Sequence, residues 1–376
     1  MDSFEAGKWL NQTGYRSFDP ARINRIWKFD DPRILEALSR ADRQLGRLDM
    51  FSEYVPNLDL FVQMHVTKEA TESSRIEDTH TEIEEAILPE EEVSEERRDD
   101  WREVNNYIRA MQEAIEALQK LPFSNRLLKN AHATLMSGVR GEHKTPGEFR
   151  VSQNWIGGSN PGNARFVPPI HEDVPELMSD LELFAHNEEL HLPPLLKVAI
   201  MHYQFETIHP FLDGNGRIGR LMVPLYLVSH DILKQPVLYL SDYLERNRDE
   251  YYDRLTRVRE DNALDDWLIF FLDGLSETAR QGVETFNEIL QFEKHWEGEI
   301  QNWKPHAASG LILFRHLFKV PVVDAKAVAE VSEISPPTAY KLIERFVEER
   351  LLREITGAKR GRLFLFDSYL SLFKRK

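Results

Sequence analysis

The feature that most constrains the fold is a helical period of apolar residues that recurs over most of the chain between residues 101 and 294. The first such segment begins at Trp101, and its apolar face carries Val104, Tyr107, Ile108, Met111, Ile115 and Leu118. The same period returns over residues 127–136, 175–187, 194–206, 215–230, 242–258 and 264–294. Spacings of three and four residues place side chains on one face of an amphipathic helix. The sequence therefore predicts a mainly α-helical fold.

One segment between these helices has a different pattern. Residues 147–170 hold two short arms of apolar residues on either side of a tip rich in Gly, Asn and Pro. Extended arms around such a tip are typical of a β-hairpin. We expect a small β-hairpin here, within a helical core domain that spans residues 101–295.

The first hundred residues are predicted to form a separate, mostly helical region over residues 1–100. An apolar period from Ile34 to Leu45 indicates one amphipathic helix, and a second helix is expected from about residue 57 to residue 78. An acidic stretch from Glu82 to Asp100 follows. Such a run of like charges is expected to face solvent.

The chain changes character at Pro305. Residues 305–376 carry 13 Lys and Arg against 8 Asp and Glu, although the whole chain has a net charge of −16. Helical periods over 311–318, 325–331 and 338–349 precede two short apolar arms, 351–355 and 363–366, around a basic turn. This order of helices and strands is the layout of a winged helix-turn-helix, which we expect over residues 305–376.

Composition excludes several classes of protein. The chain has no cysteine, so it can hold no disulfide, no thiolate zinc site and no cysteine nucleophile. Its net charge of −16 argues against nonspecific binding of nucleic acid or membranes by the whole surface. No apolar run approaches the roughly 20 residues that span a bilayer. The acidic, polar first residues lack the apolar core of a secretory signal, so we expect a cytoplasmic protein.

The most informative stretch is residues 208–220, which read Ile-His-Pro-Phe-Leu-Asp-Gly-Asn-Gly-Arg-Ile-Gly-Arg. It is expected to form a loop that ends in a Gly-Asn-Gly turn and opens an amphipathic helix. Gly214 and Gly216 let the backbone approach a ligand, and the unpaired amides of the first helical turn form an anion site. Arg217 and Arg220 lie three residues apart and can reach the same polyphosphate.

Two further side chains complete this candidate reaction site. Asp213 offers a hard oxygen ligand for Mg²⁺ that bridges phosphates. His209 has an imidazole suited to accepting a hydroxyl proton near neutral pH. Each feature alone is common in structural roles, but core packing has no use for all of them in one short segment. The pattern indicates base-assisted attack on a metal-bound phosphate chain, at a site that is not a P-loop.

Residues 209–220 resemble the signature of the Fic family, His-x-Phe-x-Asp/Glu-Gly-Asn-Gly/Lys-Arg-x-x-Arg, at every fixed position. The resemblance implies a protein adenylyltransferase, which transfers AMP from ATP to a Ser, Thr or Tyr hydroxyl of a protein and releases pyrophosphate. It implies that His209 is the general base, that Phe211 packs the loop into the core and that Asp213 holds Mg²⁺. The implied phosphate contacts are Gly214, Asn215, Gly216 and Arg217, with the terminal phosphate on Arg220.

The same resemblance implies roles outside the motif. The hairpin at 147–170 is similar to the family's flap, where Ile156, Gly157 and Gly158 would line the nucleotide and a target segment would dock by strand addition. Tyr251 and Tyr252 are similar to the family's adenine-side pair; the alternative is that they pack between helices. ATP is the implied substrate, Mg²⁺ the cofactor, and proteins with a hydroxyl side chain the partners. Self-modification and a homodimer are compatible with the family.

Residues 73–78, Ser-Ser-Arg-Ile-Glu-Asp, resemble the family's inhibitory motif, Ser/Thr-x-x-x-Glu-Gly/Asn. The resemblance implies an N-terminal inhibitory helix with Ser73 and Glu77 as its motif residues. A Glu77 carboxylate paired with Arg220 would remove the cation that positions the terminal phosphate, and the enzyme would be autoinhibited. Asp78 stands where the family has Gly or Asn. The alternative is that Glu77 is one more acidic surface residue.

Two other functions fit parts of the sequence. One is a DNA-binding regulator with a nucleotide-sensing Fic-like domain, whose basic contacts would be Lys341, Arg345, Lys359, Arg360 and Arg362. The other is a different reaction on the same fold, either removal of AMP from a modified protein or transfer of a phosphate or another nucleotide. By resemblance, Gly216 in place of the motif's Lys favours the adenylyltransferase branch over Doc-like kinases.

Overall fold

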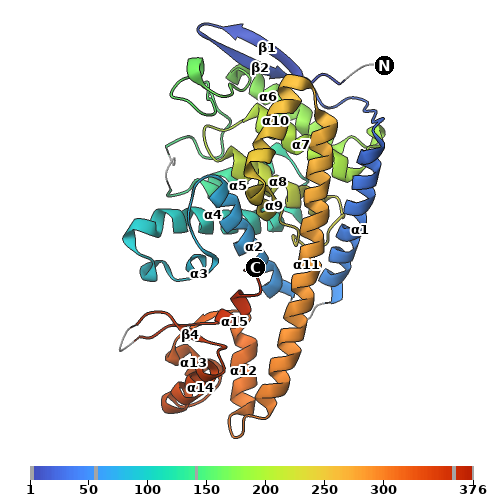
Figure 1. Cartoon of the computed structure of the whole chain (residues 1–376). Helices are drawn as coiled ribbons and strands as arrows, with labels where there is room; N and C mark the ends of the chain where they lie inside the picture. The colour runs from blue at the N-terminus through green and yellow to red at the C-terminus, as the bar shows by residue number, and fades with distance from the viewer. Residues whose placement is uncertain (1–3, 55–57, 140–142, 358–360, 375–376) are drawn as a thin grey trace.

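A computed structural model describes residues 4–54, 58–139, 143–357 and 361–374, and most of them are helical (Figure 1). An antiparallel hairpin of β1 (Gly7–Gln12) and β2 (Tyr15–Pro20) comes first. The helices α1 (Pro32–Tyr54) and α2 (Leu58–Ile76) follow, and then the short α3 (Ile83–Ala86) and α4 (Arg98–Leu118). The prediction of a mainly α-helical fold is confirmed.

The centre of the molecule is a pair of antiparallel helices that meet at one loop. This pair is α7 (Pro194–Ile208) and α8 (Asn215–Ser229), with α5 (Asn125–Leu135) and α6 (Val174–His186) packed beside it. All residues from 195 to 208 are buried, because α7 has neighbours on every side. In Figure 1, α1 and α11 (Leu264–Gln301) flank this pair on one side and α4 lies on the other.

Two shorter helices, α9 (Ser241–Arg246) and α10 (Arg248–Asp261), connect α8 to α11. The sequence pattern gave one helical segment over 242–258, but the helix is interrupted at Asn247. The Asn247 side chain donates to the backbone oxygen of Tyr243 at 2.8 Å. The same oxygen also accepts the Asn247 backbone N–H at 3.1 Å, so the interruption is a local change of backbone angles at Asn247, with a φ of −115° and a ψ of 33°.

The C-terminal elements lie at the far end of α11. They are α12 (Ala307–Leu317), β3 (Val322–Val323), α13 (Ala325–Val331), α14 (Pro336–Glu348), β4 (Arg353–Glu354), β5 (Phe364–Leu365) and α15 (Asp367–Leu370). The three strands form an antiparallel sheet in the order β3-β5-β4, with Leu365 opposite both Val322 and Arg353. The 38 residues of α11 extend about 57 Å and carry these elements away from the β1–β2 hairpin (Figure 1).

The β1–β2 hairpin was not expected from the sequence pattern. Its turn lies at Thr13 and Gly14, where Gln12 pairs with Tyr15 across a two-residue loop. Gly14 has a φ of 84°, a conformation that glycine adopts without strain.

The flap at 147–170 folds back on itself as a hairpin does, but its two arms share few backbone hydrogen bonds. Ile156 and Phe166 form one isolated antiparallel bridge, with hydrogen bonds of 2.8 and 3.1 Å between their backbones. Gly157 and Gly158 follow with φ values of 68° and 73°, which turn the chain at once. Pro168 and Pro169 lack the N–H groups that would extend the pairing on the other arm.

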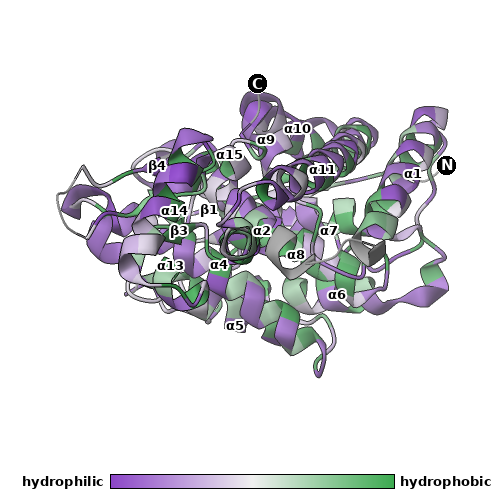
Figure 2. Cartoon of the chain, turned by 90° about the horizontal axis from the view of Figure 1, so that it is seen from below, coloured by the Kyte–Doolittle hydropathy of each residue, from purple (hydrophilic) through white to green (hydrophobic). Residues whose placement is uncertain are grey.

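Hydropathy agrees with this arrangement of layers. Figure 2 shows green and purple stripes alternating along α5, as expected for a helix with one buried face. Among the described residues, no helix combines the length and the apolar character needed to cross a membrane.

Candidate active site

The site lies where α7 ends and α8 begins. His209 terminates α7 with a φ of 51°, in the left-handed region, and its backbone N–H donates to the oxygen of Phe205 at 2.9 Å. Gly214, with a φ of 72°, is the residue before α8. The two left-handed residues reverse the chain within six residues, so the first turn of α8 faces the same region as the His209 ring.

Side chains rather than regular structure hold this loop. Asn215 accepts a hydrogen bond from the Phe211 backbone N–H at 2.8 Å and donates to the Phe211 oxygen at 2.9 Å. Asn154 donates to the backbone oxygens of His209 and Phe211, at 3.1 and 2.8 Å. Arg150 donates to the oxygens of Ile208 and His209, at 3.3 and 3.0 Å. The Asn215 side chain is therefore used inside the loop, and the phosphate contact expected of this residue stays a prediction.

Phe211 anchors the loop in the core, as the resemblance implied. Its ring is fully buried and stacks on the His132 ring, with centroids 3.8 Å apart. His132 accepts from the Gly147 N–H at Nδ1, so its proton lies on Nε2, which donates to the Asp213 oxygen at 3.0 Å. Burial lowers the pKa of His132 to about 4, so the ring is neutral at pH 7.

Asp213 presents a carboxylate that already holds a cation. Its Oδ2 is 2.6 Å from the Lys144 ammonium, and its Oδ1 accepts from the Gly214 N–H at 2.7 Å. Burial raises the pKa of Asp213, but the hydrogen bond and charge of Lys144 lower it by more, so the carboxylate stays ionised. No cluster of three or more acidic or His side chains suited to a metal occurs in the described part of the chain. A lone carboxylate fits Mg²⁺ that takes its other ligands from phosphates and water.

Arg220 is the most enclosed cation of the site. Its Nε donates to the Ser73 hydroxyl at 2.9 Å, and one terminal nitrogen donates to the Ser73 backbone oxygen at 2.9 Å and to the Glu77 carboxylate at 2.8 Å. Only 1% of the Arg220 side chain is exposed, whereas 38% of the Glu77 side chain is. Loss of water contact raises the pKa of Glu77, but Arg220 lowers it by more, so the pair is ionic.

Gly216 makes room for this ion pair. A Cβ atom at Gly216 would lie 2.2 Å from a carboxylate oxygen of Glu77 and 2.9 Å from the Arg220 guanidinium. The carboxylate therefore sits against the backbone of the first turn of α8, where an anion is favoured by the helix N-terminus.

Arg217, three residues before Arg220 on α8, binds a carboxylate of another helix. It donates to the Glu103 carboxylate of α4 at 3.2 Å, and Glu103 also accepts from the Thr79 hydroxyl at 2.9 Å. Both Arg217 and Glu103 are buried. The two arginines of the motif thus bind different carboxylates, and Arg220 alone pairs with the inhibitory helix.

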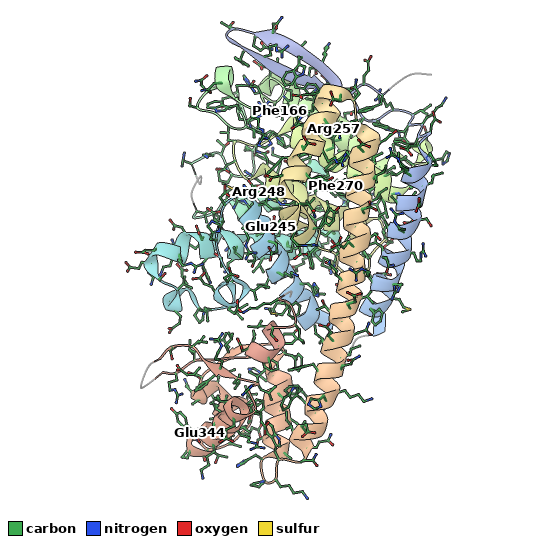
Figure 3. The ribbon with its side chains drawn as sticks, viewed as in Figure 1. Phe166, Glu245, Arg248, Arg257, Phe270 and Glu344 are labelled. Atoms are coloured by element: carbon green, nitrogen blue, oxygen red, sulfur yellow. The ribbon has the colours of Figure 1, made fainter. Side chains whose placement is uncertain are left out.

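A cavity opens next to this site, between the flap and α10. Its walls include Ile156 and Gly157 of the flap and Tyr252 of α10, all three of which the sequence assigned to the nucleotide. The cavity is open at its mouth and has a volume of about 200 Å³. The Arg259 guanidinium covers the Phe166 ring at 3.9 Å along one wall; Figure 3 labels Phe166 near the upper end of α10.

Tyr251 does not line this cavity. It is 1% exposed, and its hydroxyl donates to Nε2 of His202 at 2.9 Å, since Nδ1 of His202 must donate to the Gly219 backbone oxygen. For Tyr251 the alternative of packing between helices is therefore the one that the structure shows. Gly158 is also outside the cavity wall and forms part of the flap's turn instead.

The His209 ring is half-buried and close to several charged groups. Burial lowers its pKa to about 4, although the Glu77 carboxylate acts in the opposite direction. The imidazole is therefore neutral at pH 7 and able to accept a proton.

Several residues of the site were not found from the sequence. His132, Lys144, Arg150 and Asn154 come from the segment before and within the flap, and Trp9 of β1 lines the cavity. Each acts through a contact with a distant part of the chain, and none belongs to a motif; the helical period at 127–136 includes His132 but does not mark it as a site residue. A buried Arg or Asn that contacts an irregular loop is the one general sign of such a residue, because the loop's backbone groups need hydrogen-bond partners. This sign can be recognised only once the fold is known.

The basic residues proposed for DNA contact are partly engaged elsewhere. Arg345 is within 3.4 Å of Glu348 and 2.6 Å of Glu349 on its own helix, and it also covers the Trp303 ring at 5.3 Å. Lys341 is exposed. Figure 3 labels another acidic residue of α14, Glu344, toward the outer side of the C-terminal elements. Lys359 and Arg360 lie outside the described residues.

Comparison with protein families identifies the chain. Residues 35–116 match the Fic/DOC family N-terminal domain, and residues 122–227 match the Fic/DOC family. The two stretches together span half of the chain, and the second contains the whole motif at 209–220. The chain belongs to the Fic/DOC family.

Its relatives share only part of their length with it. A probable protein adenylyltransferase of Aquifex aeolicus is 35% identical over 97 residues, 26% of this chain and 28% of that protein. The protein adenylyltransferase Fic of Drosophila grimshawi is 32% identical over 144 residues, 38% of this chain and 27% of that protein. The chain thus spans less than a third of each of these curated relatives.

Solved structures show the same fold. A Fic family protein from Desulfovibrio desulfuricans aligns with a TM-score of 0.58 at 20% identity, over 91% of this chain and 98% of that one. A segment of Fic-1 from C. elegans aligns with a TM-score of 0.52 at 18% identity, over 69% of this chain and 75% of that one. The helical core with its small strand pairs is therefore a Fic fold.

Proposed function

We propose that this chain is a protein adenylyltransferase that transfers AMP from ATP to a Ser, Thr or Tyr hydroxyl of a protein. The observation that carries the proposal is the α7–α8 loop, in which the neutral His209 imidazole ends α7 and, six residues later, α8 begins and carries Arg220 in its second turn. Two relatives with this domain are named protein adenylyltransferases, which supports the same reaction.

In the proposed reaction, His209 takes the proton of the acceptor hydroxyl. The hydroxyl oxygen then bonds to the α-phosphorus of ATP, the bond from that phosphorus to the bridging oxygen breaks, and pyrophosphate leaves. The unpaired amides at the start of α8 would hold phosphate oxygens, and Arg220 would take the terminal phosphate. Mg²⁺ bound at Asp213 would supply positive charge to the phosphates.

We further propose that Glu77 keeps the enzyme inactive. It occupies Arg220 and lies against Gly216, so the terminal phosphate and the carboxylate would compete for one cation. Ser73 supports this state because it binds the same guanidinium through its hydroxyl and its backbone oxygen.

Transfer of labelled AMP from ATP to the purified chain tests both proposals. Glu77→Gly is expected to raise incorporation at least tenfold, since an ion pair of this kind is worth about 1.5–3 kcal/mol. His209→Ala in the same background is expected to abolish it. Incorporation by Glu77→Gly that survives His209→Ala would contradict the assigned base.

Glu72→Gly is the matched control for the inhibitory role. It makes the same substitution on α2, at a carboxylate that pairs with Arg75 instead of Arg220. Activation by Glu77→Gly but not by Glu72→Gly supports autoinhibition, whereas equal activation by both would indicate a general loosening of α2. Replacing labelled ATP by other labelled triphosphates, and offering a modified target, distinguishes the alternative reactions of the fold.

We also propose that residues 1–100, 101–295 and 305–376 are distinct domains and that the last is a winged helix-turn-helix. The winged helix-turn-helix is supported by the three successive helices α12, α13 and α14 and by the small antiparallel sheet that β3, β5 and β4 form.

A further inference from the structure

One buried carboxylate of the site has no role in the reaction described above. Glu206 belongs to α7, three residues before His209, and only 7% of it is exposed. Its Oε1 has no hydrogen-bond partner, and no Lys or Arg in the described ranges forms an ion pair with it. Burial raises the pKa of Glu206 to about 7, although Arg220 and Arg259 act in the opposite direction. An unpartnered buried carboxyl group is costly, so a ligand is a reason to keep it.

The surroundings of Glu206 leave it facing a ligand space. The unpartnered Oε1 rests against Gly219 of α8, where a Cβ atom would lie 2.1 Å from it, so Oε2 is the oxygen left for a ligand in the cavity. The side chain also lines the cavity between the flap and α10, together with Tyr252 and Arg259. Gly219 thus allows the carboxyl group to lie between the helix that starts at the phosphate site and the cavity.

The proposed reaction indicates which part of a bound nucleotide lies next to Glu206. Our inference rests on the proposed function, in which the α-phosphate lies within reach of His209. The sugar is bonded to that phosphate, and Glu206 lies one helical turn before His209 on the same face of α7. The cavity that Glu206 lines also has apolar lining residues suited to a base, among them Trp9, Phe166 and Leu255. The sugar therefore lies next to Glu206.

We propose that Glu206 is a specificity-determining residue that accepts a hydrogen bond from a ribose hydroxyl of the nucleotide. A carboxyl oxygen accepts a hydrogen bond from a hydroxyl, whereas a deoxygenated carbon donates none, so the site gains nothing from a deoxy sugar at that position. The site would consequently select ribonucleotides over deoxyribonucleotides.

Binding of nucleotides to the full-length chain, measured by calorimetry, tests the proposal. Glu77→Gly is used as the background because Arg220 is then open to the terminal phosphate. ATP is compared with 2′-deoxy-ATP and 3′-deoxy-ATP, and inosine triphosphate tests the base. We expect ATP to bind about tenfold or more tighter than at least one of the deoxy analogues, as for a hydrogen bond to a charged group. Glu206→Met is expected to bring that ratio within about threefold.

Two variants make the result specific. Glu206→Gln keeps an acceptor oxygen and is expected to retain part of the preference. Glu250→Met makes the same kind of change at an exposed residue of α10 outside the cavity and is expected to leave the ratio unchanged. The ratio of the ATP affinity to the deoxy-ATP affinity is measured within each variant. A substitution that weakens the binding of all nucleotides equally therefore leaves this ratio unchanged.

Several outcomes would overturn the inference. Equal binding of ATP and both deoxy analogues by the parent chain would do so, as would a ratio that Glu206→Met leaves unchanged. A loss of preference for ATP over inosine triphosphate, with the sugar ratio intact, would show that Glu206 reads the base instead. If no nucleotide binds, the proposed function fails as well. ATP binding without sugar discrimination overturns this inference alone.

Discussion

At the scale of single residues, the site depends on side chains that bind backbone groups. A loop without regular structure leaves its N–H and C=O groups to be satisfied by other partners. Asn215, Asn154 and Arg150 supply those partners for the loop from Ile208 to Phe211. The motif's Asn therefore shapes the loop, which explains why an amide is needed there: it accepts from one backbone group and donates to another.

The neutral His209 leads to a prediction about pH. In the Glu77→Gly chain, protonation of His209 is expected to lower kcat/KM for AMP transfer as pH drops toward about 4. A protonated imidazole cannot accept the hydroxyl proton, and burial lowers the pKa of His209 to about 4. Loss of Glu77 removes a charge that raises this pKa, so the midpoint moves no higher.

The pH profile needs a folding control, because buried neutral histidines also make proteins unstable in acid. Circular dichroism at each pH separates the two effects, and only points with an unchanged spectrum count. A midpoint at or above 6.5, the ordinary histidine pKa, would contradict the role of burial.

At the scale of elements, the end of α2 explains the departure at Asp78. The Thr79 N–H donates to the Ser74 oxygen at 3.1 Å, and the Asp78 N–H donates to the Arg75 oxygen at 3.0 Å. This pair of bonds is a Schellman motif, in which the residue after the last helical one adopts the left-handed conformation. Asp78 has a φ of 61° there, which accounts for the family's preference for Gly or Asn.

This geometry predicts opposite effects of two substitutions. Asp78→Gly is expected to leave the chain as stable or up to about 1 kcal/mol more stable, because glycine adopts a positive φ without strain. Asp78→Ala is expected to cost about 1 kcal/mol, because a Cβ without a polar group gains nothing at this φ. Urea unfolding measures both. The exposed ion pair of Asp78 with Arg248 is lost in each variant and contributes little. Equal stability of the two variants would argue against the helix-end explanation.

The helices and the motif could largely be predicted from the sequence, whereas the first hairpin and the place of Tyr251 could not. The helical period predicted α4 to α8 and α11 closely, and the motif predicted the loop, Arg220 and its pairing with Glu77. The β1–β2 hairpin was missed because its short strands are partly exposed and their apolar residues, Trp9 and Phe18, pack on Phe166 of the flap. Tyr251 was misplaced because adjacent residues of a helix point about 100° apart, and local sequence does not say which of them faces the cavity.

At the scale of the whole molecule, the helix that carries Glu77 lies between the catalytic loop and the C-terminal segment. In Figure 1, α15 lies close to α2. The Phe373 ring packs edge-on against His65 of α2 with centroids 5.2 Å apart, and it contacts Tyr369 of α15 at the same distance. Lys374 forms an ion pair with Glu84 of α3. The C-terminal elements therefore contact the inhibitory helix directly.

This contact predicts that a change at the C-terminus alters catalysis at a distance. Phe373 is 2% exposed, so Phe373→Ala leaves a cavity beside α2 and is expected to destabilise the chain by about 3 kcal/mol. With α2 less firmly held, the Glu77–Arg220 pair breaks more often, and AMP incorporation by the otherwise unmodified chain should rise several-fold. Tyr340→Ala is the control, because Tyr340 is an aromatic residue of α14 that is 50% exposed. The same Phe373 substitution in the Glu77→Gly chain should add no activity, since the inhibitory pair is already absent. An increase there would show that Phe373 acts through something other than α2.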